Sequence, residues 1–122
     1  MIGKFIEGDK PMIEATIAWG QAVQTPYFVL DTGFTGDLAV TPEIAVELGL
    51  NIDGVTKMRT ASNELIAVRS AVALASMEGE NIYITVLITD GLPLLGIAFM
   101  EKFKYKAIVD CKNKTVALEV SK

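Results

Sequence analysis

Residues 28–36, with the sequence FVLDTGFTG, hold the residue types that acid–base chemistry requires. Asp31 directly follows three apolar residues, so we expect its carboxyl group to be partly buried at the end of a strand. Gly33 allows the backbone to turn sharply there and lets another group approach closely. A carboxylate held in this way can act as a general acid or base. The same pattern also fits an aspartate that only opens a turn, and this stretch alone leaves both interpretations open.

Two absences limit the chemistry open to the rest of the chain. The sequence has no histidine, which excludes Ser-His-Asp and Cys-His catalysis and histidine-ligated zinc. Cys111 is the only cysteine, so an intrachain disulfide or a cysteine metal cluster is excluded as well. A lone cysteine is typical of a reducing compartment, where it acts as a small apolar residue. Catalysis by this chain must therefore use carboxylates, hydroxyls or lysines.

Length, composition and charge favour one folded domain over residues 1–122. Hydrophobic residues make up 51% of the 122 and charged residues 21%, which is enough apolar material for a core and excludes a largely disordered chain. The formal net charge is −4, and no basic cluster offers a face for nucleic acid. The N-terminus lacks a secretory apolar segment, and the longest uncharged stretch, 15–30, is too interrupted to span a membrane. We expect a cytoplasmic protein without nucleic-acid or membrane partners.

Alternating apolar residues and β-branched runs predict a mostly β fold. The ranges with these patterns are 12–19, 27–30, 70–76, 82–88, 105–110 and 115–120. Turns are expected at 20–21, 78–81 and 112–114, where glycine, asparagine and charged residues collect. In all, the patterns predict about seven strands.

Two short helices complete the expected elements. The N-cap signature of residues 41–43 (TPE) and the stop signal at Gly49 predict one helix between them. A second short helix is expected over 97–103, with Phe99 and Phe103 packed inward.

The landmarks of the chain, taken in order, resemble those of a known family. Residues 30–33 (LDTG) are followed, after a hairpin candidate at 58–66, by two aliphatic residues and a glycine at 94–96 that lead into the second helix. The strand candidate 107–110 comes after that helix. This order and spacing resembles the retropepsin-like aspartic peptidases, of the small single-domain type found in prokaryotes as well as retroviruses. The resemblance covers residues 12–120.

The resemblance implies a fold class and a reaction. The fold is all-β, a single-domain retropepsin-like (acid protease) closed barrel or sandwich with one or two short helices, assembled as a two-fold homodimer. The reaction is hydrolysis of peptide bonds in a peptide or unfolded protein, by a water held between Asp31 and its symmetry copy, which share one proton. The second copy is needed because the chain has only one Asp-Thr-Gly sequence. The resemblance implies no metal and no organic cofactor.

The resemblance also implies supporting roles around Asp31. Thr32 would form hydrogen bonds across the two-fold axis, Gly33 would present backbone to the substrate, and Thr35 would help to hold the carboxylate. The second loop of the site would consist of Leu94, Leu95 and Gly96. Its glycine would let the segment pass close behind the catalytic loop.

The substrate-binding flap would be the turn of the hairpin 58–66. Its tip residues are Thr60, Ala61, Ser62, Asn63 and Glu64. None of them is a glycine, but Asn63 tolerates the left-handed conformation that a tight turn requires. Phe34 and Gly36 stand where the family usually has a small and a polar residue, so we expect a changed specificity at these two positions.

Two other functions remain open on the sequence alone. A dimer of the same fold could bind peptides or partner proteins with little or no proteolysis, and the flap without glycine keeps this alternative open. Glycoside hydrolysis would need paired carboxylates in an aromatic-lined cleft, whereas aromatic residues make up only 7% of the chain. Glu43 and Glu47 lie four apart, a pair that is usually solvated rather than metal-binding. We assign no role to Asp37 or Asp110.

Overall fold

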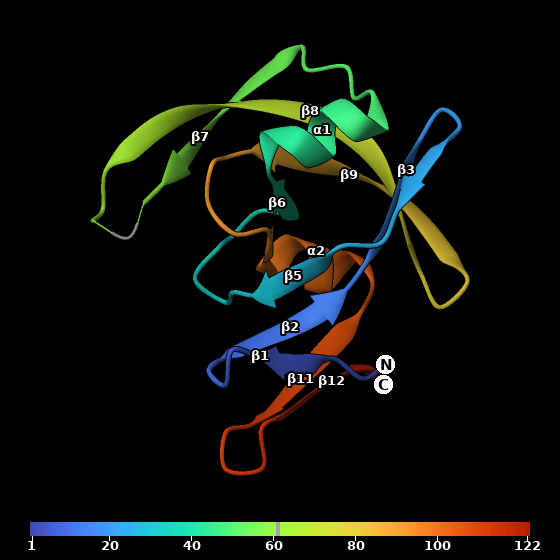
Figure 1. Cartoon of the computed structure of the whole chain (residues 1–122), viewed down its shortest axis with the longest axis vertical. Helices are drawn as coiled ribbons and strands as arrows, with labels where there is room; N and C mark the ends of the chain where they lie inside the picture. The colour runs from blue at the N-terminus through green and yellow to red at the C-terminus, as the bar shows by residue number, and fades with distance from the viewer. Residues whose placement is uncertain (61) are drawn as a thin grey trace.

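The protein's computed structural model describes residues 1–60 and 62–122, which form twelve strands and two helices (Figure 1). The strands are β1 (Lys4–Ile6), β2 (Lys10–Glu14), β3 (Thr16–Trp19), β4 (Ala22–Gln24), β5 (Tyr27–Leu30), β6 (Leu38–Val40), β7 (Gly54–Arg59), β8 (Leu65–Met77), β9 (Glu80–Ile88), β10 (Leu94–Leu95), β11 (Tyr105–Asp110) and β12 (Thr115–Val120). The helices are α1 (Pro42–Leu48) and α2 (Ile97–Lys102). The expected mostly β fold with two short helices is confirmed. The strands outnumber those predicted because β1, β4, β6 and β10 have three residues or fewer, too few to show a pattern.

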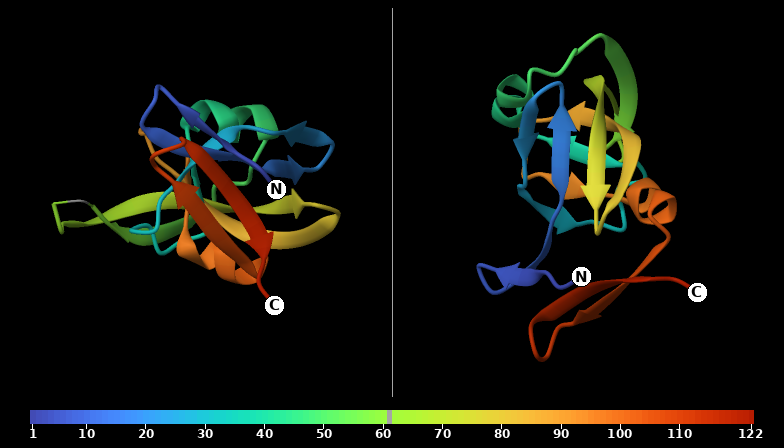
Figure 2. Two further views of the ribbon diagram at one scale, coloured as in Figure 1. Left: turned by 90° about the horizontal axis from the view of Figure 1, so that it is seen from below. Right: turned by 90° about the vertical axis from the view of Figure 1, so that its right-hand side faces the viewer.

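Ten strands form one curled sheet, and the last two form a separate hairpin. The order in the large sheet is β1-β2-β5-β10-β6-β9-β8-β3-β4, with β7 paired to β8 beside this path. β11 and β12 form a separate two-stranded sheet, and β12 is joined to the N-terminal segment by an isolated bridge between Ile2 and Ala117. The hairpin of β7 and β8 reaches out at one end of the molecule, and β11 and β12 lie at the opposite end (Figures 1 and 2).

The predicted single strand over residues 12–19 is wrong: the chain forms two strands there. β2 ends at Glu14 and β3 begins at Thr16, with Ala15 between them donating its N–H to Pro26 O at 3.2 Å. β2 pairs with β1 and β5, whereas β3 pairs with β4 and β8. The alternation of apolar residues continues through the break, because both strands bury one face in the same core. The sequence pattern therefore shows the faces but not the change of partner strand.

The predicted turns and caps are found close to where they are expected. The β3–β4 turn falls at residues 20–21, and the β8–β9 turn is shorter than predicted, since only Glu78 and Gly79 remain unpaired. Both of these residues have positive φ, as a type I′ hairpin turn requires. In α1, Thr41 accepts a hydrogen bond from the N–H of Ile44 and Gly49 ends the helix in the left-handed conformation.

The core joins the curled sheet to both helices. Its largest fully buried side chains are Phe28, Phe99, Ile13, Ile17, Leu38, Leu95 and Leu118. Burial of each such side chain stabilises the fold by about 1.5–3 kcal/mol. Phe28 and Leu95 belong to β5 and β10, so the two short strands that carry the candidate site are anchored in the centre of the core. No helix in the described part of the chain is both long and apolar enough to cross a membrane.

Candidate active site

Asp31 lies at the end of β5, where the chain leaves the sheet. Its N–H donates to Leu95 O at 3.0 Å, so the backbone at this point is still held by β10. Its carboxylate Oδ1 accepts the N–H of Gly33 at 2.9 Å, and its C=O accepts the N–H of Phe34 at 3.1 Å. These bonds form a tight turn that fixes the direction of the side chain. Asp31 as a whole residue is half-buried, in line with the partial burial that the sequence predicts.

The other predicted residues of this loop lie around the carboxylate. Gly33 is close enough that an added Cβ would stand 3.3 Å from Asp31 Oδ1. Thr32 and Thr35 are exposed, and they line different hollows next to Asp31. Neither hydroxyl hydrogen-bonds to Asp31 within the described residues, so their supporting roles remain predictions.

The predicted second loop lies directly against the first. Leu94 and Leu95 of β10 run parallel to β5 and antiparallel to β6, so β10 sits between the two strands that flank the Asp31 loop. Gly96 N–H then donates to Asp37 O and Ile97 N–H to Phe34 O, both at 2.9 Å. The structure therefore brings the segment 94–96 and Asp31 together, as the sequence predicts.

Phe34 and Gly36, the two unusual positions of the loop, depend on each other. The Phe34 ring is 6% exposed and packs in a small cluster with Ala39 and Leu87. A Cβ on residue 36 would lie 2.7 Å from Cζ of this ring. The Phe34 ring fills the space that a side chain at position 36 would need. The large residue at 34 therefore requires a glycine at 36.

Asp37 is a buried carboxylate to which sequence reasoning assigned no role. Asp37 is 5% exposed. Its Oδ2 accepts a hydrogen bond from the N–H of Thr85 at 2.9 Å and forms an ion pair with Lys102 Nζ at 2.6 Å. Its Oδ1 has no hydrogen-bond partner in the described chain. The ion pair ties the loop after Asp31 to α2, and the hydrogen bond from Thr85 ties it to β9. The sequence does contain a signal for burial of this carboxylate: Asp37 directly precedes three apolar residues, just as Asp31 directly follows three.

The predicted flap is a hairpin of β7 and β8. Arg59 pairs with Leu65, and the turn between them is closed by Thr60 N–H to Glu64 O at 2.8 Å and Asn63 N–H to Thr60 O at 2.9 Å. Asn63 has a φ of 68°, the left-handed conformation predicted for it. Ser62 and Glu64 are exposed beside it, and Ala61 lies outside the described residues.

A cleft of about 850 Å³ is lined by both the Asp31 loop and β7 of the flap. Its apolar lining includes Phe34, Met58, Leu87, Leu94 and Ala98. Its polar lining includes Asp31, Thr35, Thr56 and Thr60. An extended peptide would find apolar contacts in this cleft within reach of one carboxylate. No group of three or more carboxylates and cysteines that could hold a metal ion occurs among the described residues.

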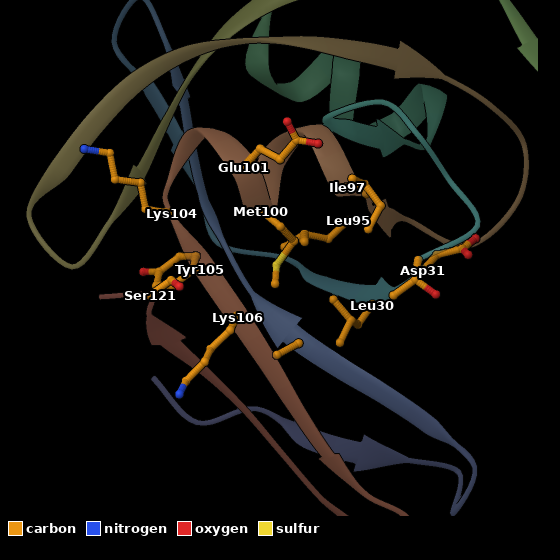
Figure 3. Close-up of a pocket in the computed structure, with 13 residues that line it drawn as sticks. Leu30, Asp31, Leu95, Ile97, Met100, Glu101, Lys104, Tyr105, Lys106 and Ser121 are labelled. Carbon is orange, nitrogen blue, oxygen red and sulfur yellow. The ribbon is translucent and has the colours of Figure 1, made fainter.

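A second hollow, of about 400 Å³, lies on the other side of Asp31 (Figure 3). Asp31 stands at one end of it and Tyr105 at the other, with Leu30, Leu95 and Met100 between them. Asp31 and its loop therefore separate two concave surfaces. The sequence analysis does not predict this second surface, because its residues come from four separate segments.

Comparison with known proteins gives the fold. No protein-family model and no curated protein matches the sequence. The crystal structure of a retropepsin-like aspartic protease from Rickettsia conorii superposes with a TM-score of 0.65 and 21% identity, over 97% of this chain and 87% of that one. EIAV protease complexed with the inhibitor HBY-793 superposes with a TM-score of 0.63 and 15% identity, over 86% of this chain and 98% of that one. The chain has the retropepsin-like fold.

Proposed function

We propose that the chain is an aspartic endopeptidase that acts as a homodimer. The observation that carries the proposal is the position of Asp31: a half-buried carboxylate on a tight loop of a retropepsin-like fold, at the edge of a cleft under a hairpin flap. The two superposed structures are, by their names, a retropepsin-like aspartic protease and a protease with an inhibitor. The chain offers one such loop, so the second carboxylate comes from a second copy.

The reaction follows from two carboxylates at close range. Two negative charges in a partly dry cleft repel each other by several kcal/mol at effective dielectric constants of about 20, so the pair retains one proton. The ionised oxygen takes a proton from the water as it attacks the peptide carbonyl, and the protonated one donates to the carbonyl oxygen. This is the established logic of aspartic proteases, in which the proton belongs to the pair. The chain's own part is to hold Asp31 through the Gly33 N–H and the Leu95 C=O.

The substrate is a peptide or an unfolded protein. The cleft is mostly apolar, and its flap strand β7 provides a backbone along which an extended chain can lie. Met58 and Leu87 face this space beside the Asp31 loop, so apolar side chains near the cleaved bond fit it best.

A dimer that binds peptides with little or no proteolysis is the alternative function. The specific observation in its favour is the flap turn, whose backbone groups at Thr60 and Asn63 already bond within the turn. Arg59 Nη1 adds bonds to Asn63 O at 3.1 Å and to Asn63 Oδ1 at 3.2 Å. A flap closed on itself in this way has fewer free groups with which to grip a substrate.

The test is digestion of a peptide library, read by mass spectrometry, with the wild type and Asp31→Asn. We expect cleavage by the wild type, strongest at acidic pH because the pair must keep one proton, and inhibition by a statine-type compound. Asp31→Asn should abolish cleavage and leave the fold and the dimer intact. Asp53→Asn, an exposed carboxylate outside the cleft, is the matched control and should cleave normally.

Two results would separate the alternatives. Unchanged turnover by Asp31→Asn would show that Asp31 takes no part in the reaction. Peptide binding by the dimer with no products after long incubation supports the binding function instead.

A further inference from the structure

The loop of residues 31–37 (DTGFTGD), between β5 and β6, has few side chains that can hold it in place. Two of its residues are glycines, and two are exposed threonines whose hydroxyls form no hydrogen bond within the described residues. Besides the buried Phe34 ring, the side chains that fix the loop are those of its end residues, Asp31 and Asp37. Residues 33–37 all line the larger cleft, so the position of this loop determines the shape of the cleft.

Asp37 joins its end of the loop to three other segments. Its Oδ2 accepts the N–H of Thr85 on β9 and forms the ion pair with Lys102 on α2. Its C=O accepts the N–H of Gly96 at 2.9 Å. No other lysine or arginine forms an ion pair with Asp37 in the part of the chain that the structure describes. The loop, β9 and α2 therefore meet at this one residue.

Helix α2 contacts the loop at both of its ends. In its first turn, the N–H of Ile97 donates to Phe34 O at 2.9 Å and the N–H of Ala98 donates to Gly36 O at 3.2 Å. Lys102 is the last residue of the same helix. A change at the lysine end of the helix is therefore transmitted to the carbonyl groups of the loop.

The two partners of the ion pair differ in burial. The side chain of Asp37 is 3% exposed, whereas that of Lys102 is 42% exposed. A buried carboxylate that loses its cation is left as an uncompensated charge, but a half-exposed ammonium can be hydrated. The Oδ1 atom of Asp37 already lacks a partner in the described chain. Loss of the lysine should therefore displace the loop more than loss of the acid.

Asp31 is held by contacts that do not involve the ion pair. Its N–H donates to Leu95 O, and its Oδ1 accepts the N–H of Gly33. A displacement that begins at Asp37 therefore reaches residues 34–36, which line the cleft, before it reaches the carboxylate of Asp31.

We propose that Asp37 and Lys102 are positioning residues of the substrate cleft. Their ion pair holds residues 34–37 in the place where the loop contacts an extended peptide, and neither residue takes part in the chemical step. The inference rests on the proposed function, which supplies the peptide. It assigns to this pair an effect on substrate binding that is separate from any effect on the reaction at Asp31.

The first test compares KM and kcat for a cleaved peptide in Lys102→Met, in Asp37→Asn and in the double variant. Lys102→Met should raise KM about tenfold, because the cleft-lining loop moves, and should leave kcat within about twofold of the wild type. Asp37→Asn should raise KM less, since the remaining lysine is hydrated. The double variant should resemble Asp37→Asn rather than the sum of both changes. Lys102→Arg retains the charge and should restore most of the binding.

Lys10→Met is the matched control. Lys10 also forms an ion pair, with Glu7 at 2.8 Å, but this pair lies at the β1–β2 turn and Glu7 is 72% exposed. Its loss should change neither KM nor kcat. A fall in kcat with unchanged KM in Lys102→Met would mean that the pair only keeps the chain folded, and it overturns the inference. If Lys102→Met does not fold, Asp37→Asn decides, and an unchanged KM in that variant overturns the inference as well.

The second test does not depend on cleavage. Amide hydrogen exchange at Gly96, Ile97 and Ala98 reports the bonds from α2 to the loop, and it should become at least tenfold faster in Lys102→Met or, if that variant does not fold, in Asp37→Asn. The N–H of Leu118, which donates to Met1 O at the far end of the molecule, should keep its rate. Unchanged exchange at the three amides, or an equal rise at Leu118, overturns the inference. If only the three amides respond but the wild type cleaves no peptide, the positioning of the loop stands and the proposed reaction fails.

Discussion

Gly96 is required by the close approach of two backbones rather than by its conformation. A Cβ at this position would stand 2.6 Å from Phe34 O and would overlap Gly36 O, which are backbone atoms that cannot turn aside. The same approach makes the hydrogen bonds from Gly96, Ile97 and Ala98 to the loop that follows Asp31 possible. The glycine therefore sets the distance between α2 and the loop that follows Asp31.

Gly96→Ala should lower the free energy of unfolding by about 3 kcal/mol, the upper end for overpacking, because one of the two backbones must move. It should also reduce cleavage, since the loop that moves carries Asp31. Gly91→Ala is the matched control: an added Cβ there meets no atom within 4 Å, and the expected change is below about 0.5 kcal/mol. Urea denaturation of both variants measures the difference. Equal stabilities would contradict the close-approach explanation.

The residues of the site differ in how far the sequence reveals them. The partly buried position of Asp31 and the left-handed Asn63 follow from residue type and local order, whereas the close approach at Gly96 is predicted only by the resemblance to the family. The coupling of Phe34 to Gly36 does not, because it depends on which way an aromatic ring turns within an irregular loop. Hydrophobic periodicity carries no information about such a loop.

The flap is an element whose conformation depends on one residue. Asn63 adopts a φ of 68°. Its C=O and its side-chain oxygen also accept hydrogen bonds from the Arg59 guanidinium. The first property is available to glycine, and the second requires the amide. The two contributions can therefore be separated by substitution.

Asn63→Ala should loosen the flap turn by about 1–2 kcal/mol, because alanine is strained in the left-handed conformation. Asn63→Gly keeps the conformation and loses only the side-chain contact, so its effect should be smaller. Amide hydrogen exchange of β7 and β8 near the turn measures the loosening, and kcat/KM for a cleaved peptide should fall in the same order. Identical exchange in the two variants would show that φ at position 63 does not limit the flap.

Regular elements are where the sequence is most informative about this fold. The strands β5, β11 and β12 begin and end at the predicted residues, and α1 has its predicted caps. The division of 12–19 into two strands and the existence of β10, with its two residues, could not be predicted. Both are determined by which distant strand a segment pairs with, and a pattern within the segment does not show this.

The β8–β9 hairpin is attached to β11 by one hydrogen bond that should respond to alkaline pH. Tyr105 donates its hydroxyl to Glu78 Oε1 at 2.7 Å. Burial, and then the hydrogen bond to Glu78, raise the pKa of Tyr105 well above its ordinary value of 10.0. In the unfolded chain the phenol ionises near pH 10, while in the folded chain it keeps its proton. The contribution of Tyr105 to stability is therefore complete below pH 10 and is lost as the pH rises above it.

Tyr105→Phe should lower the free energy of unfolding by about 1 kcal/mol at neutral pH, the usual value of one hydrogen bond. It should also flatten the decline in stability above pH 10. Tyr83→Phe is the control, since Tyr83 lies on the same hairpin, is 67% exposed and donates no hydrogen bond within the described residues. Denaturation series at several alkaline pH values measure both variants. If stability declines above pH 10 in Tyr105→Phe just as it does in the wild type, the decline is caused by other groups.

The whole molecule presents Asp31 between two concave surfaces. The larger one lies under the hairpin of β7 and β8, and the smaller one lies beside β11. Under the proposed function, the same carboxylate would face both the substrate and the carboxylate of a second copy. The single chain is then half of an active site, and activity should depend on pairing rather than on the amount of chain alone.

This dependence predicts the result of mixing wild type with Asp31→Asn. If subunits exchange freely, an equal amount of the variant places about half of the wild-type subunits in mixed dimers, which have one carboxylate and cannot share a proton. Cleavage by a fixed amount of wild type should therefore fall to about half, and to about a quarter with a threefold excess. Added Asp53→Asn, which retains the catalytic residue, should instead raise cleavage in proportion to its amount. Cleavage that stays constant as Asp31→Asn is added, after subunit exchange has been verified with labelled chains, would mean that one chain contains the complete site.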